Sequence, residues 1–205
     1  MPRLVLTSRN KGKLKELKRL VSGLPWEVLS LYDFPGVPEV EEDGVTFKEN
    51  AIKKATTVAR YLNEWTLADD SGLEVKALNG APGVFSARFA GVQGDDERNN
   101  KKLLQLLEDV PWEKRSARFR CVLAFASPEG KVIWTTEGDC EGIITYEPRG
   151  KKGFGYDPLF YLPALELTMA ELSEEKKNQI SHRAKAMKDF REYLFQRTSD
   201  IFHCE

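Results

Sequence analysis

Short apolar runs and amphipathic stretches alternate along the first third of the chain. Residues 3–7 and 26–31 are mostly apolar runs bounded by polar loops, which predicts two buried strands. Between them, leucines recur at helical spacing over residues 14–21, with Lys and Arg on the other face. Residues 46–62 carry a continuous apolar stripe behind a Thr-x-x-Glu capping box, so they predict a second and longer helix.

The rest of the chain is richer in strand patterns. Residues 66–75 are apolar but interrupted by Asp, Ser and Gly, which predicts a strand, a turn and another strand. Residues 95–110 predict a helix with acids at its start, and residues 118–139 predict a hairpin that turns at Pro-Glu-Gly. Another strand is predicted at 141–150 and a last helix from Ser181 onward. Together these elements predict an α/β fold on a mixed sheet, whose strand-rich middle is compatible with a second lobe.

Composition narrows the functional classes. The chain has 205 residues and a formal net charge of −1, so no global field draws it to nucleic acid or to a membrane surface. No apolar run is long enough to span a bilayer. Cys121, Cys140 and Cys204 are odd in number and lack metal-site spacing, which favours free thiols in a reducing compartment. We therefore expect a cytoplasmic protein with no nucleic-acid or membrane partner.

Two adjacent acids, Asp69 and Asp70, follow the apolar pair Leu67-Ala68. Charge is costly to desolvate, so the pair needs an explanation. One explanation is a tight turn, because Asp, Ser and Gly all favour turns. The other is a cation held by carboxylates, to which the acidic run Glu39–Gly44 could contribute if one of its acids faces the pair. Most acidic runs of that kind are simply solvated surface.

Three further segments carry groups that suit a nucleotide. Ser8–Lys13 joins a strand to a helix, so its backbone N–H groups and lysines form either a phosphate cradle or an ordinary capped turn. Gly153–Pro158, with the sequence GFGYDP, offers aromatic faces between glycines for base stacking, or forms a structural loop. His182 and Arg183 oppose the dipole of the last helix, which suggests a bound anion or a paired surface turn. Together the segments favour a nucleoside triphosphate site.

Five segments then stand out together and in this order: SRNKGK, TFKENAIKKA, LADDSGLEVKALNGAPGVFSARFAG, GFGYDPLF and EEKKNQISHRAKA. In this combination, from about Leu4 to about Phe195, the chain resembles the inosine triphosphate pyrophosphatase family. The resemblance implies Mg²⁺-dependent hydrolysis of non-canonical purine nucleoside triphosphates (ITP, dITP and XTP) to the monophosphate and pyrophosphate. It also implies an α/β fold with a long mixed sheet flanked by helices. Residues 1–205 would form one catalytic domain with two lobes and a central cleft, and would assemble as a homodimer.

The resemblance also implies roles for single residues. Glu41, the first acid of EEDG, and Asp70 match metal-binding positions, and Asp70 also matches the proton acceptor. The matching substrate contacts are Ser8, Arg9, Asn10, Lys11, Gly12, Lys13, Ser71, Phe154, Gly155, Tyr156, Asp157, Lys177, His182 and Arg183. Lys54, on the predicted helix at 46–62, is a further candidate for phosphate contact, or else an exposed helical lysine.

These residues support attack of water on the α-phosphorus. Mg²⁺ at Glu41 and Asp70 would bridge the phosphate oxygens, with lysines neutralising the remaining charge. Asp70 would either take the proton or serve mainly as a ligand while the metal activates the water. Asp69 would raise the proton affinity of Asp70 or be purely structural.

Base selectivity has a simple physical basis. A backbone N–H or Arg183 aimed at C6 would donate a hydrogen bond to the oxygen of inosine or xanthosine. Adenine has an amino group there, so two donors would face each other and adenine would be disfavoured. Two other functions stay open. One is a pyrophosphatase for other modified or pyrimidine nucleotides, and the other is a sensor that binds nucleotides without turnover.

Overall fold

The computed structural model describes residues 1–202. Its strands are β1 (Arg3–Leu6), β2 (Glu27–Ser30), β3 (Trp65–Val75), β4 (Ser116–Ala126), β5 (Val132–Ile144), β6 (Phe160–Leu162) and β7 (Leu167–Thr168). Within the described residues they form a seven-stranded sheet in the order β2-β1-β3-β4-β5-β6-β7. β1 pairs in parallel with β2 and β3, whereas β6 pairs antiparallel with β5 and β7. The predicted α/β fold on a mixed sheet is confirmed.

The chain divides into two compact units. Unit 1 comprises Met1–Asp70, Val122–Glu137 and Lys185–Glu205, and unit 2 comprises Ser71–Cys121 and Gly138–Ala184. The first boundary falls inside β3, directly after the acid pair. The central cleft stays a prediction.

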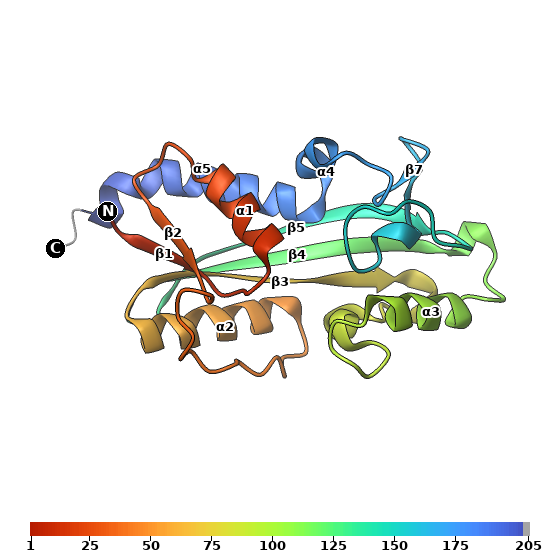
Figure 1. Cartoon of the computed structure of the whole chain (residues 1–205), viewed down its shortest axis with the longest axis horizontal. Helices are drawn as coiled ribbons and strands as arrows, with labels where there is room; N and C mark the ends of the chain where they lie inside the picture. Colours follow the sequence, from red (N-terminus) through yellow and green to blue (C-terminus); the bar gives the residue numbers. More distant parts are fainter. Residues whose placement is uncertain (203–205) are drawn as a thin grey trace. The chain divides into compact units, whose positions relative to one another are not determined.

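Unit 1 is a layered α/β arrangement. Its helices are α1 (Lys11–Leu20), α2 (Phe47–Leu62) and most of α5 (His182–Phe202). Figure 1 shows α2 on one face of β1 and β3 and α1 with α5 on the other. Between the strands and α5, Phe125 packs edge-on against Phe190, with ring centroids 5.3 Å apart, and stacks on Trp65 at 5.1 Å. Burial of these large rings is a main source of stability for the unit.

The long helix α2 forms as its sequence predicts, with one difference at its start. The apolar stripe is buried, and Thr46 Oγ1 accepts from the Glu49 N–H at 3.1 Å. Glu49 Oε2 reaches back to the N–H of Val45, at 2.8 Å, so this capping box closes one residue earlier than the usual pattern. Asn63 ends the helix in the left-handed conformation.

Unit 2 contains α3 (Asp96–Leu106) and α4 (Glu174–Ile180), and its core includes Leu73, Leu103, Phe119 and Phe160. Arg115 is buried in this unit beside the end of α3. Its guanidinium donates to the carbonyls of Leu107, Val110 and Thr145, at 2.5, 2.9 and 2.8 Å. A buried cation that satisfies several carbonyl groups in this way fixes the turn after α3.

Two sequence predictions are wrong in the strands. β3 runs without a turn from Trp65 to Val75, because each carboxylate of the acid pair finds a lysine and the backbone can stay extended. The separate strand predicted at 141–150 does not form. Residues 141–144 continue β5, where Ile143 and Ile144 pair with Tyr161 and Phe160 of β6, and the strand ends at Ile144.

Other predictions are confirmed. The Pro-Glu-Gly segment turns between β4 and β5, where the Gly130 N–H bonds to the Ser127 carbonyl at 2.8 Å. α5 begins at His182, and Ser181 Oγ accepts from the Ala184 N–H at 3.2 Å. α4 has no counterpart among the predicted elements, because it is only one to two turns long.

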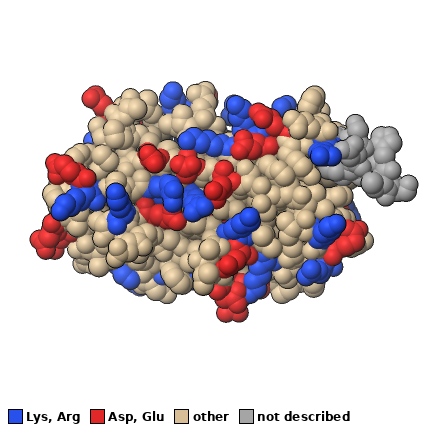
Figure 2. Space-filling model, turned by 180° about the vertical axis from the view of Figure 1, so that it is seen from behind, with Lys and Arg blue, Asp and Glu red and all other residues tan. Residues whose placement is uncertain are grey.

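No helix among residues 1–202 is both long and apolar enough to cross a membrane. Cys121 and Cys140 are buried and form no disulfide within the described residues, and Cys204 lies outside them. Figure 2 shows acidic and basic side chains intermingled over the visible face, in keeping with the small net charge.

Candidate active site

In unit 1, side-chain hydrogen bonds hold the loop after β1. Ser8 Oγ accepts from the Asn10 N–H at 3.1 Å. Asn10 is the N-cap of α1, and its Oδ1 accepts from the N–H groups of Gly12 and Lys13 at 2.8 and 3.1 Å. Two amides expected to cradle phosphate are thus already bonded within the protein. The backbone here is a capped turn, and an anion bound to it depends mainly on side-chain charge.

The three cations of this loop lie in different surroundings. Arg9 donates to the carbonyl of Val37 at 3.4 Å, and the Lys11 ammonium lies 5.9 Å from the ring centroid of Tyr32. Lys13 instead reaches β3, where its Nζ lies 2.7 Å from Asp69 Oδ1. Lys13 is therefore the cation of the loop that is held next to the acid pair.

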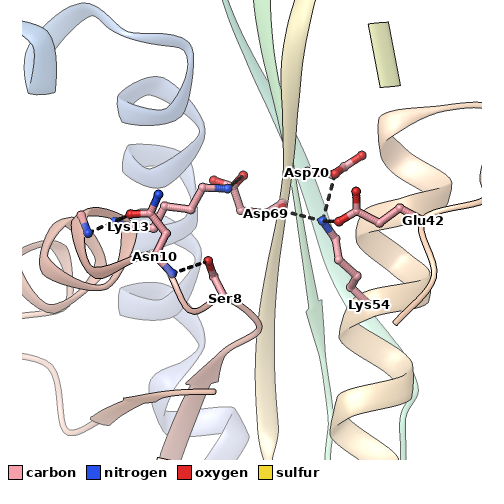
Figure 3. A network of polar contacts seen from close by, with 8 residues as sticks. Ser8, Asn10, Lys13, Glu42, Lys54, Asp69 and Asp70 are labelled. Atoms are coloured by element: carbon pink, nitrogen blue, oxygen red, sulfur yellow. Dashed lines mark hydrogen bonds and ion pairs between the residues drawn. The ribbon is translucent and has the colours of Figure 1, made fainter. Parts of the chain in front are cut away.

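The two acids serve opposite faces of β3. Successive side chains of a strand point to opposite sides, so Asp69 turns toward α1 and Asp70 toward α2 (Figure 3). The Asp69 side chain is fully buried against Lys13. Asp70 Oδ1 lies 2.9 Å from the Nζ of Lys54, which α2 supplies. Each acid thus has its own lysine from a different helix.

Lys54 joins the acidic loop to β3. Its ammonium donates to Glu42 Oε1 at 2.8 Å, to the Asp69 carbonyl at 2.9 Å and to Asp70 Oδ1. Three acceptors match the three N–H donors of an ammonium, so Lys54 is saturated. Burial acts to lower the pKa of Lys54, but the charges of Asp70 and Glu42 and the bonds to them outweigh it, and the pKa is raised. Lys54 is therefore a firmly charged link and not an exposed helical lysine.

Asp70 has one oxygen to spare. Its Oδ2 is buried and has no hydrogen-bond partner among the described residues. Burial raises the pKa of this carboxyl, and Lys54 only partly offsets the effect. Nearby Asn50 lowers it slightly, although the Asn50 side-chain nitrogen makes no hydrogen bond of standard geometry within the described chain. A buried carboxylate oxygen without a donor is a natural ligand for a cation.

In unit 2, residues Gly153–Asp157 of the predicted segment Gly153–Pro158 form a compact turn, called here the aromatic loop. Gly153 and Gly155 have φ of +80° and +62°, a region that favours glycine. A side chain at Gly153 would collide with Asp157, whose Oδ2 also accepts from the Phe154 N–H at 2.9 Å. Phe154 is half exposed, whereas Tyr156 is buried and donates to the Ser86 carbonyl at 2.8 Å. Of the two rings, Phe154 is the one available for stacking.

Cations surround Phe154. Lys177 pairs with Asp157 and lies 4.8 Å from the Phe154 ring centroid, and the buried Arg183 guanidinium lies 5.7 Å from it. His182 stacks on Phe119, with centroids 4.9 Å apart. The structure therefore gathers Phe154, Lys177 and Arg183, whereas His182 also packs on the core. Ser71, at the start of unit 2, is partly exposed.

The sequence matches a known family over nearly its whole length. A model of the Ham1 family matches residues 4–193. The chain belongs to the Ham1 family. It is 59% identical to the dITP/XTP pyrophosphatase of Desulforamulus reducens, over 94% of this chain and 95% of that protein, and 54% identical to that of Geobacter sulfurreducens, over 95% and 97%.

Solved structures agree with this assignment. A HAM1 protein from Coxiella burnetii superimposes with a TM-score of 0.89 at 44% identity, covering 96% of this chain and all of that one. The Staphylococcus aureus Ham1 protein gives a TM-score of 0.86 at 42% identity, covering 95% and 98%. The Ham1 fold of this chain is thus shared by solved members of the family.

The structure of this Ham1 chain also revises the acidic loop. Glu42, which was not among the predicted site residues, reaches Lys54 beside Asp70, while Glu41 is exposed. Asp43, the next acid, pairs instead at the surface with Lys53 at 2.6 Å. The Gly44 N–H donates to Asn50 Oδ1 at 2.8 Å, which ties the end of the acidic segment to α2. Nothing local in the sequence singles out Glu42, because its partner Lys54 lies 12 residues further along the chain.

Proposed function

We propose that this chain hydrolyses non-canonical purine nucleoside triphosphates, namely ITP, dITP and XTP, to the monophosphate and pyrophosphate. The carrying observation is the free buried Oδ2 of Asp70 beside Lys54 and Glu42. The relatives at 59% and 54% identity are named for this activity on dITP and XTP. A homodimer and a cytoplasmic location remain predictions, the latter supported by two buried cysteines that form no disulfide within the described residues.

The residues present fit Mg²⁺ as a cofactor. Asp70 and Glu42 offer hard carboxylate oxygens, and we assign the second ligand to Glu42 in place of Glu41. No group of three or more His, Cys, Asp or Glu in the described part of the chain could hold a metal by itself. Mg²⁺ typically takes one or two carboxylates and completes its shell with water and substrate phosphates. When bound, it would neutralise phosphate charge and polarise the bond to be broken.

Lys54 gives these carboxylates a counter-charge of their own. Its ammonium holds Glu42 and Asp70 together, so the acids keep their positions despite mutual repulsion. With a cation held by these oxygens, Lys54 would have N–H donors available for a phosphate oxygen. Lys54 would then act as an electrostatic partner of the triphosphate, which is the phosphate-contact role considered for it from the sequence.

Asp70 would orient the attacking water and accept its proton. A pKa raised by burial moves this carboxyl toward the range in which a base works well near neutral pH. Lys13, fixed by Asp69, supplies positive charge from the α1 side of β3. Little covalent chemistry is needed beyond this, because positioning and charge neutralisation dominate phosphoryl and nucleotidyl transfer.

Base recognition falls to unit 2. Phe154 offers a half-exposed ring for stacking, and Arg183 is a buried donor beside it. A donor that meets the C6 oxygen of inosine or xanthosine would leave the amino group of adenine without an acceptor.

A panel of triphosphates tests the proposal. Purified protein with Mg²⁺ would be given ITP, dITP, XTP, ATP, GTP and dTTP, and pyrophosphate and monophosphate would be quantified. We expect release of pyrophosphate from the first three, little from the others, and none after EDTA. Release of orthophosphate, or tight ITP binding without turnover, would overturn the proposed function.

A further inference from the structure

The peptide groups of Gly155 are fastened on both sides by one helix. The Gly155 N–H donates to Asp96 Oδ2 at 2.6 Å, and the Gly155 carbonyl accepts from Asn100 Nδ2 at 2.9 Å. Asp96 and Asn100 are four residues apart on α3, so they lie on the same face of the helix. All three residues belong to unit 2, and neither α3 residue was expected to act at the site. We call this arrangement the α3 clamp (Asp96 and Asn100 on Gly155).

The aromatic loop needs such a clamp because its own sequence does not define one conformation. Glycine on either side of Phe154 leaves the backbone with a wide choice of φ, at a large entropic cost when it is ordered. Asp157 fixes the N–H before the ring, and the α3 clamp fixes the peptide groups after it. The half-exposed Phe154 ring is thus oriented by hydrogen bonds to its flanking backbone.

A second contact keeps the loop in register. The buried Tyr156 hydroxyl donates to the Ser86 carbonyl at 2.8 Å. Burial, followed by the nearby charge of Asp96, raises the pKa of Tyr156, so the phenol stays a neutral donor. Tyr156 is therefore anchored independently of the clamp, which leaves the backbone at Gly153–Gly155 as the part of the loop that Asp157 and the α3 clamp have to hold.

We propose that Asp96 and Asn100 are positioning residues for base recognition, which hold Phe154 in the orientation that stacks on the purine. The inference rests on the proposed function for its substrate. Because the loop is ordered before the nucleotide arrives, binding does not have to bear that entropic cost. Neither residue needs to touch the substrate.

Helix capping is the competing explanation for Asp96, and the chain offers a control for it. Asp95 is the N-cap of α3, since its Oδ1 accepts from the Arg98 N–H at 3.0 Å. Glu97 is exposed in the same first turn, and its negative charge interacts favourably with the helix dipole, as that of Asp96 does. Glu97→Ala therefore removes the same charge without touching Gly155.

The test compares Asp96→Ala and Asn100→Ala with Glu97→Ala, using two readouts. We expect both clamp variants to raise KM for ITP about tenfold, with kcat changed less than about twofold, as fits the loss of one hydrogen bond to a charged or polar partner. Amide hydrogen exchange in a peptide covering residues 150–159 should quicken by about the same factor. Glu97→Ala should match the wild type in both, and Asp96→Asn, which keeps an acceptor, should recover most of the KM.

The exchange readout does not depend on turnover. If the wild type released no pyrophosphate from any triphosphate, the proposed function would fall, while faster loop exchange in Asp96→Ala would still support the clamp. Unchanged loop exchange in both clamp variants would overturn the clamp. An equal rise of KM in Glu97→Ala, or a clamp defect carried only by kcat, would overturn the positioning role.

Discussion

Asp69 and Asp70 are adjacent in β3, yet their carboxylates lie on opposite faces of the strand and pair with lysines from different helices. Lys13 holds Asp69, whereas Lys54 holds Asp70 together with Glu42. Consecutive residues of β3 therefore bind side chains from α1 on one face of the strand and from α2 on the other. The acid pair is not a dyad that shares a proton, and the two aspartates should respond differently to substitution.

Asp70→Asn should abolish most turnover without loss of the fold. The amide is isosteric but cannot accept the proton of water and binds cations weakly, so kcat should fall on the order of 10³-fold. Steady-state pyrophosphate release and circular dichroism would measure this. A variant that keeps near-normal kcat would remove Asp70 from the mechanism.

Because the pKa of Asp70 is raised in the folded protein, ionisation of this carboxyl should lower the free energy of unfolding as the pH rises. Its folded pKa lies above the ordinary value of 3.8, so the folded state binds the proton more tightly than the unfolded chain does. The resulting stability is present below pH 3.8 and is lost as the pH rises through the folded pKa. Asn at position 70 does not titrate and avoids this loss. Asp70→Asn should therefore raise the free energy of unfolding, relative to the wild type, more at about pH 7 than at about pH 4.

Urea unfolding of both proteins at the two pH values would measure that difference. Lys54 does not blur the comparison, since its pKa is raised above 10.5 and its charge is constant over this range. A difference of the opposite sign would show that pairing with Lys54, and not burial, dominates Asp70.

Asp69→Asn should act mainly on stability and on substrate affinity. It removes the counter-charge of Lys13 at a fully buried position, and Lys13, being slightly exposed, can recover only part of its hydration. We expect a loss of about 1–3 kcal/mol in unfolding free energy and a higher KM for ITP. Asp43→Asn, which breaks the exposed pair with Lys53, is the control and should change neither. If Asp69→Asn kept the KM of the wild type, Lys13 would not contribute to phosphate binding.

Glu42→Gln and Glu41→Gln form a matched pair on adjacent residues. Glu42→Gln removes a ligand beside Asp70, so the Mg²⁺ concentration needed for half-maximal activity should rise about 100-fold. Glu41 is exposed, so Glu41→Gln should leave that concentration unchanged. Titration of activity with Mg²⁺ at saturating ITP would decide between them. The reverse ranking would restore Glu41 as the ligand.

The sequence by itself determined the local elements and the family. The apolar stripe of α2, its Thr46 cap and the helix start at Ser181 depend on nearest neighbours along the chain, so their patterns predict them directly. The glycine-flanked Phe154 and the acid pair likewise marked the segments that carry polar chemistry. The order of the five motifs along the chain was sufficient to indicate the pyrophosphatase family.

Only the tertiary structure decided which way the side chains face. Asp-Asp-Ser-Gly looked like a turn because local propensity favours one, and lysines from two helices kept it extended instead. The same applies to the contact of Glu42 with Lys54 and to the α3 clamp on Gly155. In each case the deciding partner is distant in sequence, and a hydrogen bond or an ion pair between distant residues leaves no local periodicity to read.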